Sequence, residues 1–347
     1  MLQSAYQHDA SANLEIAGEK KRVPLLHAGS HSAVLNKLAR FMDKEAFLMT
    51  TIQIEQLVKQ YRGRQQPALD HVSLNIQSGM YGLLGKNGAG KSTLMKILTT
   101  LEQPTSGKVL VDGTPLKDAR SIRRKIGYLP QQFGFYPTMK VIDAMTYLAI
   151  LAEVPAREQK RRIERLLAAV HLTAQAQTKV KALSGGMLQR LGIAQALVNE
   201  PRVLIVDEPT AGLDPEERIR FRNLLADFAN ERLVLLSTHI VSDVEATTNR
   251  IGILDHGRLV FNGTTDELID AAAGHVFVGD LPVAQLKQFK TQYQISEQTA
   301  HGQHIRVRFL ARTPLATWQS VAPTLEEAYL YLQTQHHQAL VKTVSGV

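Results

Sequence analysis

Polar and hydrophobic residues alternate in three short stretches of the chain. The alternation covers residues 52–57, 72–76 and 108–111, and it predicts strands that are buried on one face only. Turn-forming residues separate the stretches, for example Asp112 and Gly113 after the last one. We therefore expect a small antiparallel sheet.

Continuous hydrophobic runs form a second pattern, at residues 81–84, 203–206 and 233–236. A strand without alternation is typical of a parallel sheet that is covered on both faces. Elsewhere hydrophobic residues recur every three or four positions, which predicts helices. These helices cover residues 93–98, 141–151, 158–170, 188–198 and 216–230. Strands that alternate with helices predict an α/β fold.

The first part of the chain is weakly patterned. Residues 1–48 contain one amphipathic stretch, at 32–48, which indicates either a partner-binding helix or, in the interpretation we prefer, a poorly ordered extension. Met49 directly precedes the first alternating strand, so we treat it as an alternative natural start of the protein.

The pattern changes again after a predicted hairpin at 251–263. Beyond it we predict short elements without any chemical motif, namely strands at 275–278 and 304–309 and helices at 283–289 and 325–332. We interpret residues 264–347 as a small accessory α/β domain. It would regulate, dimerise or brace the rest of the chain.

One glycine-rich segment lies between the run at 81–84 and the helix at 93–98. It matches the phosphate-binding pattern G-x-x-x-x-G-K-[ST] without a gap. Glycines let the backbone approach phosphate oxygens, so that main-chain N–H groups and the positive end of the helix bind the anion. Lys91 is placed to reach the β- and γ-phosphates, and Ser92 to ligate Mg²⁺. We predict that a nucleoside triphosphate binds to Gly85, Lys86, Asn87, Gly88, Ala89, Gly90, Lys91, Ser92 and Thr93.

Two acidic residues follow the run at 203–206. Because neighbouring side chains on a strand point to opposite sides, Asp207 and Glu208 need different roles. We predict that Asp207 faces Mg²⁺ and that Glu208 acts on the water that attacks the γ-phosphate. Acids at strand ends also occur as plain caps, but the phosphate loop upstream favours the catalytic interpretation.

Two polar side chains follow other predicted strands. Gln131 comes after Pro130, which ends an apolar run and opens a loop. His239 comes after the run at 233–236, where an imidazole can donate to a γ-phosphate oxygen and hold the attacking water. We predict that His239 contributes to catalysis, whereas the residues around Gln131 indicate only the start of a loop.

Two further features are weaker on their own. Ser184, Gly185 and Gly186 precede the helix at 188–198, and they combine a serine N-cap with uncovered N–H groups, which makes a second anion site. Tyr61 lies beyond the first strand, where its ring either stacks on a base or is an ordinary half-buried side chain. The spacing favours neither interpretation of Tyr61.

Composition narrows the class of protein. The chain has 347 residues, a net charge of +8 and no cysteine, which excludes disulfides, thiolate metal sites and a cysteine nucleophile. Its basic residues are scattered among many acidic ones, and the basic run at 157–165 indicates a solvated helix face more than a phosphate or lipid contact. We find no hydrophobic run near the roughly 20 residues that span a bilayer and no signal peptide, so we expect a cytoplasmic chain.

With these motifs in order, residues 51–263 resemble the nucleotide-binding subunit of ATP-binding cassette (ABC) transporters. The resemblance implies a RecA-like P-loop NTPase core with an antiparallel β subdomain and a helical subdomain at about 132–200. This ATP-binding domain would span 49–263, between the extension at 1–48 and the accessory domain at 264–347. The implied cofactors are ATP and Mg²⁺, and the implied activity is ATP hydrolysis.

The resemblance also implies roles for single residues. Tyr61 corresponds to the aromatic that stacks on adenine, and Gln131 to the glutamine that senses Mg²⁺ and the γ-phosphate. His239 corresponds to the switch histidine of the family. The segment Ser184, Gly185 and Gly186 belongs to the signature sequence, and Asp214 to the loop that crosses the dimer interface.

Partners follow from the same resemblance. It implies that two copies close around two ATP molecules and drive a separate transmembrane permease from the cytoplasmic face of the cell membrane. Segments 126–140 and 323–329 look like those of bacterial exporters of drugs, lipids or polysaccharides, so we expect export. The alternative is a soluble ATPase of this type that acts on nucleic acid or ribosomes. We expect no nucleic acid partner, because the chain has neither a coiled-coil or zinc insertion nor a second cassette.

Overall fold

The computed structural model describes residues 11–16, 19–24 and 51–345, apart from Ala211, Glu231, Pro314 and Ala316. The chain divides into two units, residues 1–46 and 47–347. In the first unit, strands β1 (Ser11–Ile16) and β2 (Glu19–Pro24) pair antiparallel. The helix predicted at 32–48 and the alternative start at Met49 lie outside the described residues.

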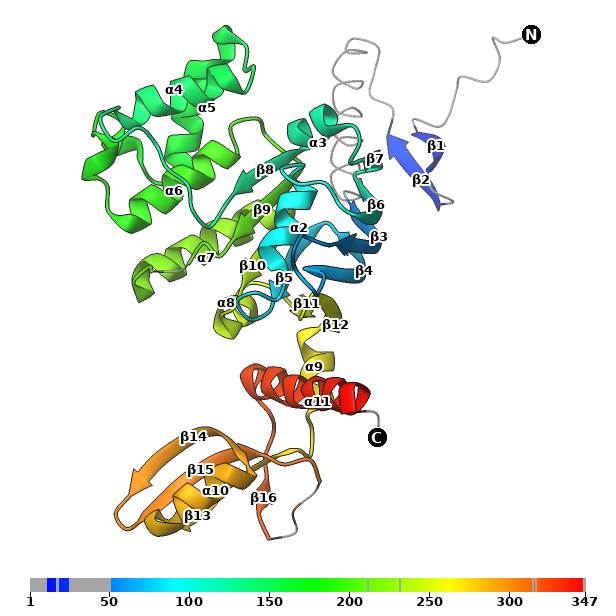
Figure 1. Ribbon diagram of the computed structural model, residues 1–347. Helices are drawn as coiled ribbons and strands as arrows, with labels where there is room; N and C mark the ends of the chain where they lie inside the picture. The colour runs from blue at the N-terminus through cyan, green and yellow to red at the C-terminus, as the bar shows by residue number, and fades with distance from the viewer. Residues whose placement is uncertain are drawn as a thin grey trace. The chain divides into compact units, whose positions relative to one another are not determined.

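A six-stranded sheet forms the centre of the second unit, in the order β12-β11-β5-β10-β9-β8 (Figure 1). Its strands pair in parallel, except that β12 is antiparallel to β11. The strands are β5 (Gly79–Leu84), β8 (Ile126–Leu129), β9 (Val203–Asp207), β10 (Leu233–Thr238), β11 (Arg250–Asp255) and β12 (Arg258–Thr264). The three continuous hydrophobic runs become β5, β9 and β10, which confirms the predicted parallel sheet.

A second, antiparallel sheet has the order β4-β3-β6-β7, which confirms the other predicted sheet. Its strands are β3 (Thr51–Lys59), β4 (Leu69–Gln77), β6 (Ser106–Val111) and β7 (Thr114–Pro115). One hydrophobic core joins this sheet to helix α2 (Lys91–Leu98) and to one face of the parallel strands. Val203 and Ile205 of β9 belong to this core.

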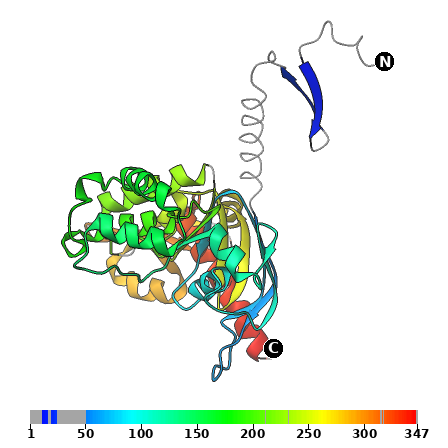
Figure 2. The ribbon, with the colours of Figure 1, turned by 90° about the horizontal axis from the view of Figure 1, so that it is seen from above.

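The alternate residues of β9, Leu204 and Val206, belong to a different core on the opposite face of the sheet. In that core they pack against the helical region, which is drawn in green on the side away from the blue antiparallel strands (Figures 1 and 2). Its helices are α4 (Val141–Leu151), α5 (Ala156–Ala169), α6 (Gly185–Ala196) and α7 (Pro215–Ala229), with single turns η1 (Thr173–Gln175) and η2 (Val180–Ala182). Burial on both faces explains why β9 shows no alternation.

The sequence analysis missed two short helices of this unit. Asp118 caps α3 (Ala119–Lys125) by accepting from Ser121 N–H, and α8 (Val241–Glu245) follows the strand β10. α3 has 7 residues and α8 has 5. Helices this short do not contain enough turns for a helical period of hydrophobic residues to be recognised. Among the described residues, none of the helices combines the length and the apolar character that crossing a membrane requires.

Beyond β12, a four-stranded sheet has the order β14-β15-β13-β16. The elements are α9 (Thr265–Ala271), β13 (Val276–Pro282), η3 (Val283–Gln285), α10 (Leu286–Gln292), β14 (Gln294–His301), β15 (His304–Leu310), β16 (Gln319–Ser320) and α11 (Leu325–Ser345). Phe277, Phe309 and Trp318 pack around one side of this sheet. The predicted β13, β15, α10 and α11 are present, whereas the largely exposed β14 was missed.

The hydrophobic residues of helices α9 and α11 pack with the central sheet. Leu325, Ala328 and Tyr329 of α11 share a hydrophobic core with Val244 of α8 and Ile251 of β11. These residues from α11 are at most 7% exposed. The last helix of the chain is therefore part of the packing around the ATP-binding domain.

Candidate nucleotide-binding site

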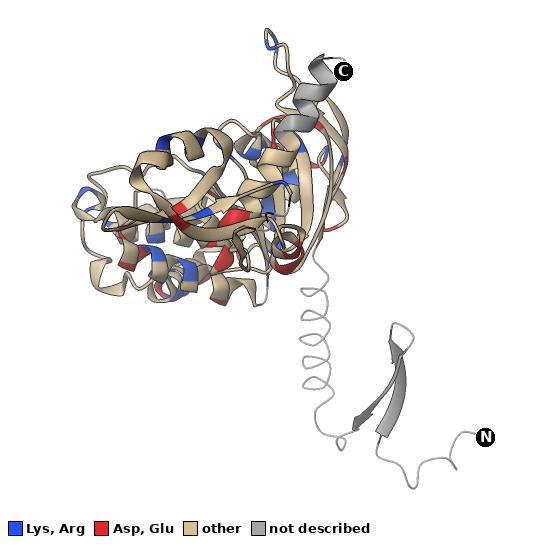
Figure 3. Ribbon diagram, turned by 90° about the horizontal axis from the view of Figure 1, so that it is seen from below, with Lys and Arg blue, Asp and Glu red and all other residues tan. Residues whose placement is uncertain are grey.

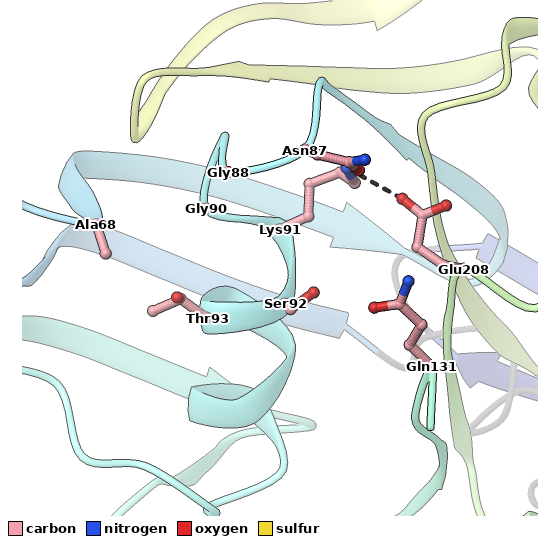
Figure 4. A pocket seen from close by; sticks show the side chains of 9 residues that line it. All are labelled: Ala68, Asn87, Gly88, Gly90, Lys91, Ser92, Thr93, Gln131 and Glu208. Carbon is pink, nitrogen blue, oxygen red and sulfur yellow. Dashed lines mark ion pairs between the residues drawn. The ribbon is translucent and has the colours of Figure 1, made fainter. Parts of the chain in front are cut away.

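A cavity of about 380 Å³ lies where the loop after β5 meets the end of β9 (Figure 4). The chain brings four separate segments to it: the segment before β4, the loop between β5 and α2, the loop after β8, and the residue after β9. The lining residues are Ala68, Asn87, Gly88, Gly90, Lys91, Ser92, Thr93, Gln131 and Glu208. All but Ala68 were predicted from the sequence.

The loop between β5 and α2 requires glycine at two positions. Gly90 has a φ of +109°, and a Cβ atom on it would lie 2.5 Å from the carbonyl oxygen of Ala68. A Cβ atom on Gly85 would lie 2.5 Å from the carbonyl oxygen of Leu254. Gly90 is also the N-cap of α2 and offers no side chain to its first N–H groups. The start of α2 can therefore direct uncovered N–H groups and a positive dipole end toward an anion.

Lys91 crosses the cavity to the end of β9. Its ammonium donates to the carbonyl oxygens of Gly85 at 2.6 Å and Lys86 at 3.2 Å. It also forms an ion pair with Glu208, with 3.1 Å between Nζ and Oε1 (dashed line in Figure 4). Both side chains are at most 5% exposed. The ammonium of Lys91 therefore lies at the wall of the cavity, with its charge balanced by Glu208.

Glu208 has a strained backbone, with a φ of +51°. A left-handed conformation costs a residue other than glycine about 1–3 kcal/mol. A hydrogen bond from its N–H to the carbonyl oxygen of Ser237, at 2.9 Å, holds this turn against β10. The carboxylate Oε2 then lies 2.5 Å from Nδ1 of His239. The structure therefore brings Lys91, Glu208 and His239 together, as the sequence predicted.

Asp207 is buried at the end of β9 and is 2% exposed. Its Oδ1 has no hydrogen-bond partner among the residues that the structure describes. Burial raises the pKa of the neighbouring Tyr128 well above its usual value, and the charge of Asp207 raises it further. An unpaired buried carboxylate oxygen fits a cation nearby.

The oxygen donors of the cavity suit Mg²⁺, which prefers carboxylate, hydroxyl and amide oxygens together with water and phosphate. Ser92 and Gln131 both line the cavity. No cluster of three or more His, Cys, Asp or Glu side chains suited to a metal occurs in the described part of the chain. The donor set therefore fits an ion that is bound partly by the nucleotide rather than by protein alone.

Tyr61, Lys86, Gly85 and Ala89 were predicted to contact nucleotide, but they do not line this cavity. The hydroxyl of Tyr61 donates to Glu102 at 2.5 Å, and Lys59 Nζ lies 5.0 Å from the ring centre. Burial raises the pKa of Tyr61, and the hydrogen bond to Glu102 adds to the shift. Stacking of Tyr61 on adenine stays a prediction.

The signature residues begin a different helix. Ser184 caps α6, with its hydroxyl accepting from Met187 N–H at 3.2 Å. Asp214 caps α7, with its carboxylate accepting from Glu217 N–H at 2.9 Å. A Cβ atom on Gly186 would lie 2.5 Å from the carboxylate of Glu217, so the starts of α6 and α7 are in contact. The signature residues, Ser184, Gly185 and Gly186, and Asp214 do not line the cavity that Lys91 crosses.

Sequence reasoning missed three residues around this site. Ala68 lines the cavity, and its carbonyl oxygen lies against Gly90, but no motif marks it. Thr210 and Asp243, which follow Glu208 and His239 in the chain, are hydrogen-bonded to each other. The signal that could have found this pair is an acid four residues after His239, between the apolar residues Val241 and Val244.

A family model described as "ABC transporter" matches residues 69–211. An uncharacterized ABC transporter ATP-binding protein of Nostoc sp. is 39% identical over 244 residues, which are 66% of this chain and 72% of that protein. The methionine import ATP-binding protein MetN of Latilactobacillus sakei is 32% identical over 317 residues, which are 82% of this chain and 92% of that protein.

A similar solved structure is the dimeric post-hydrolysis state of the ATP-binding cassette MJ0796 bound to ADP and Pi. It has a TM-score of 0.56 and 28% identity, and it covers 61% of this chain and 98% of that one. The chain therefore belongs to the ATP-binding subunits of ABC transporters, and its reaction is the hydrolysis of ATP.

Proposed function

We propose that two copies of this chain close around two ATP molecules and that hydrolysis drives a solute through a separate membrane subunit. The observation that carries the proposal is that Lys91 and Glu208 line one cavity and that His239 contacts Glu208. Three side chains from three segments of the chain supply a phosphate anchor, a carboxylate and an imidazole within hydrogen-bond reach.

In this proposal Lys91 and the N–H groups at the start of α2 hold the β- and γ-phosphates. Glu208 orients the attacking water and accepts its proton, and His239 holds the carboxylate and the water in line. Ser92 and Gln131 would bind Mg²⁺ directly, with Asp207 behind them. When bound, Mg²⁺ would neutralise charge on the phosphate oxygens.

Pairing of two copies explains why the signature residues lie apart from the cavity. The start of α6 presents uncovered N–H groups near Ser184, which a phosphate from another copy would satisfy. The dimeric relative with bound ADP and Pi supports this arrangement. Hydrolysis would remove the bridging γ-phosphate and let the two copies separate.

Exposed hydrophobic side chains support contact with a membrane subunit. Tyr147, Ile150 and Leu151 of α4 are 41%, 58% and 62% exposed, and Tyr136, which packs edge-on against Tyr147, is 62% exposed. Apolar side chains grouped on a surface are typical of protein contacts. We propose that this surface meets the membrane subunit at the cytoplasmic face of the membrane.

On transport direction, the relatives do not support the export that we expected from segments 126–140 and 323–329. The MetN relative, matched over 92% of its length, is named for methionine import, and the name of the Nostoc relative states no direction. We therefore propose import, and methionine is the first solute to test. The interspersed acidic and basic residues (Figure 3) argue against the alternative, an ATPase acting on nucleic acid.

The test is to purify the chain from detergent-solubilised membranes, identify the polypeptide that accompanies it, and rebuild both in lipid vesicles. With this chain and ATP outside the vesicles, an importer carries the solute out and an exporter carries it in. Lys91→Ala should abolish transport, whereas Lys96→Ala, on the same helix but 50% exposed, should leave it intact. Purification with ribosomes or nucleic acid and no membrane polypeptide would contradict the proposal.

A further inference from the structure

We propose that Thr210 and Asp243 form a buried clasp, which positions Glu208 and His239 for hydrolysis without contacting the nucleotide. Thr210 lies two residues after Glu208, and Asp243 lies four residues after His239. The hydroxyl of Thr210 donates to Oδ2 of Asp243. The inference rests on the proposed roles of Glu208 and His239.

Burial makes this hydrogen bond strong. Thr210 is 2% exposed and Asp243 is 0% exposed. A hydrogen bond to a charged group in a medium that excludes water is worth more than a neutral one on the surface. Arg222, the nearest base, is 3.8 Å from Oδ1 of Asp243 and donates instead to the carbonyl oxygen of Ser242 at 3.1 Å. The hydroxyl of Thr210 is therefore the main partner that holds the carboxylate.

Two other contacts join the same two segments. The N–H of Glu208 donates to the carbonyl oxygen of Ser237 at 2.9 Å, and Oε2 of Glu208 lies 2.5 Å from Nδ1 of His239. The backbone contact lies at the strand ends, the contact between Glu208 and His239 comes next along both segments, and the clasp lies farthest along them. Three contacts in a row fix the direction in which each segment leaves the sheet.

The clasp is needed because the backbone of Glu208 is strained. With a φ of +51°, Glu208 returns to an ordinary conformation unless the chain on both sides is held. The hydrogen bond to Ser237 holds the side toward β9, and Thr210 holds the side beyond. Relaxation of this turn would move the carboxylate away from Lys91 and His239, and a displacement of about 1 Å reduces rates by about a hundredfold.

The partner side of the clasp is also braced. Asp243 belongs to α8, whose Val241 and Val244 pack in the core that contains Leu325 and Tyr329 of α11. The hydroxyl of Thr247 donates to the carbonyl oxygen of Asp243 at 2.6 Å. Asp243 is thus a fixed point, and Thr210 is the residue that it holds.

The test compares kcat, KM and equilibrium ATP binding in three variants. Thr210→Val removes the donor at constant shape, and kcat should fall by about tenfold to a hundredfold while ATP binding changes less than about twofold. Thr210→Ser keeps the hydroxyl and should restore most of kcat. Thr248→Val is the control, because its hydroxyl donates to the carbonyl oxygen of Met80 at 2.7 Å and joins no catalytic segment.

Thr210→Val leaves a buried carboxylate unpaired and could fail to fold for that reason alone. The double variant Thr210→Val with Asp243→Leu replaces both partners by apolar groups, which restores stability without the clasp. A stable double variant with low kcat supports the proposal, and one with normal kcat overturns it. Glu208→Gln is measured beside it: normal turnover there would instead refute the role of Glu208.

Discussion

Glu208 and Glu327 are buried carboxylates that each have a basic partner, and they differ in how many hydrogen bonds they accept. Glu208 at the nucleotide site is 4% exposed, and Glu327 at the start of α11 is 3% exposed. Arg308 donates two hydrogen bonds to Glu327, at 2.9 and 2.7 Å. Lys91 reaches Glu208 only as an ion pair at 3.1 Å, and Oε1 of Glu208 accepts no hydrogen bond from the described residues.

The surroundings of the two acids continue this contrast. Glu327 also accepts from Ser296 at 2.7 Å and from the N–H of Thr324 at 2.9 Å, so each of its oxygens has two donors. Glu208 has one nitrogen neighbour per oxygen and a strained backbone. A saturated carboxylate can only hold structure together. An unsaturated one keeps lone pairs free for water and substrate.

The largest expected effect is at the unsaturated acid. Glu208→Gln should reduce ATP turnover by about 10²–10⁴-fold, because the amide cannot accept the proton of the attacking water. ATP binding should persist, because Lys91 and the glycine loop are unchanged. Equilibrium binding measures the affinity for ATP, single-turnover kinetics measures hydrolysis, and sedimentation measures the oligomeric state. We expect sedimentation to show a dimer that ATP stabilises.

Glu216→Gln is the matched control for this prediction, because the side chain of Glu216 is 76% exposed on α7. Its turnover should equal that of the unmodified protein. Normal turnover in Glu208→Gln would remove the distinction between the two buried acids.

The next effect concerns the saturated acid. Arg308→Met should lower the free energy of unfolding by about 3–5 kcal/mol, because it leaves the buried charge of Glu327 without its base. Adding Glu327→Leu should recover much of this loss, and the folded protein should keep its kcat. Thermal or urea unfolding measures the stability. Recovery of stability with lost turnover would show that this pair also takes part in the reaction.

The ion pair of Arg308 and Glu327 should also make the stability of the protein depend on pH. Burial alone would raise the pKa of Glu327, but hydrogen bonds from Arg308, Ser296 and Thr324 lower it from 4.5 to about 2. Because the folded pKa is the lower one, the stabilisation is fully present above pH 4.5 and is lost as pH falls toward 2. This contribution is about 3 kcal/mol. In urea unfolding across this pH window, the free energy of unfolding of Glu327→Gln should change less with pH than that of the unmodified protein.

The smallest effect compares two helix caps. Thr324 caps α11, with its hydroxyl accepting from the N–H of Glu327 at 3.2 Å, and Thr324→Ala should cost about 1 kcal/mol of stability with normal turnover. Ser184→Ala removes the cap of α6 at a similar cost, but it should also weaken turnover by removing a contact to the second ATP. Equal turnover in both variants would argue against the dimeric site.

The sequence allowed the central part of the fold and most of the cavity to be predicted. Hydrophobic runs identified β5, β9 and β10, and a motif of contiguous residues identified the loop that contains Lys91. Both signals are local, because a strand buried on two faces and a loop that surrounds phosphate each restrict neighbouring residues directly. Glu208 and His239 were found because each follows a buried strand.

Contacts between distant residues could not be predicted in this way. Thr210 and Asp243 are 33 residues apart, and Arg308 and Glu327 are 19 apart, so only the folded chain shows that they are partners. Segment 323–329, which leads into α11, resembles exporters in sequence and contributed to the prediction of export. In the structure, its residues Thr324 and Glu327 form a helix cap and a buried ion pair, which are structural features.

The packing of α11 has a consequence for biosynthesis. Leu325, Ala328 and Tyr329 pack with β11 and α8, and they follow these elements in the chain by more than 60 residues. A nascent chain that has emerged only through β12 still exposes this apolar surface. Folding of the ATP-binding domain is therefore complete only when α11 has been synthesised and covers it.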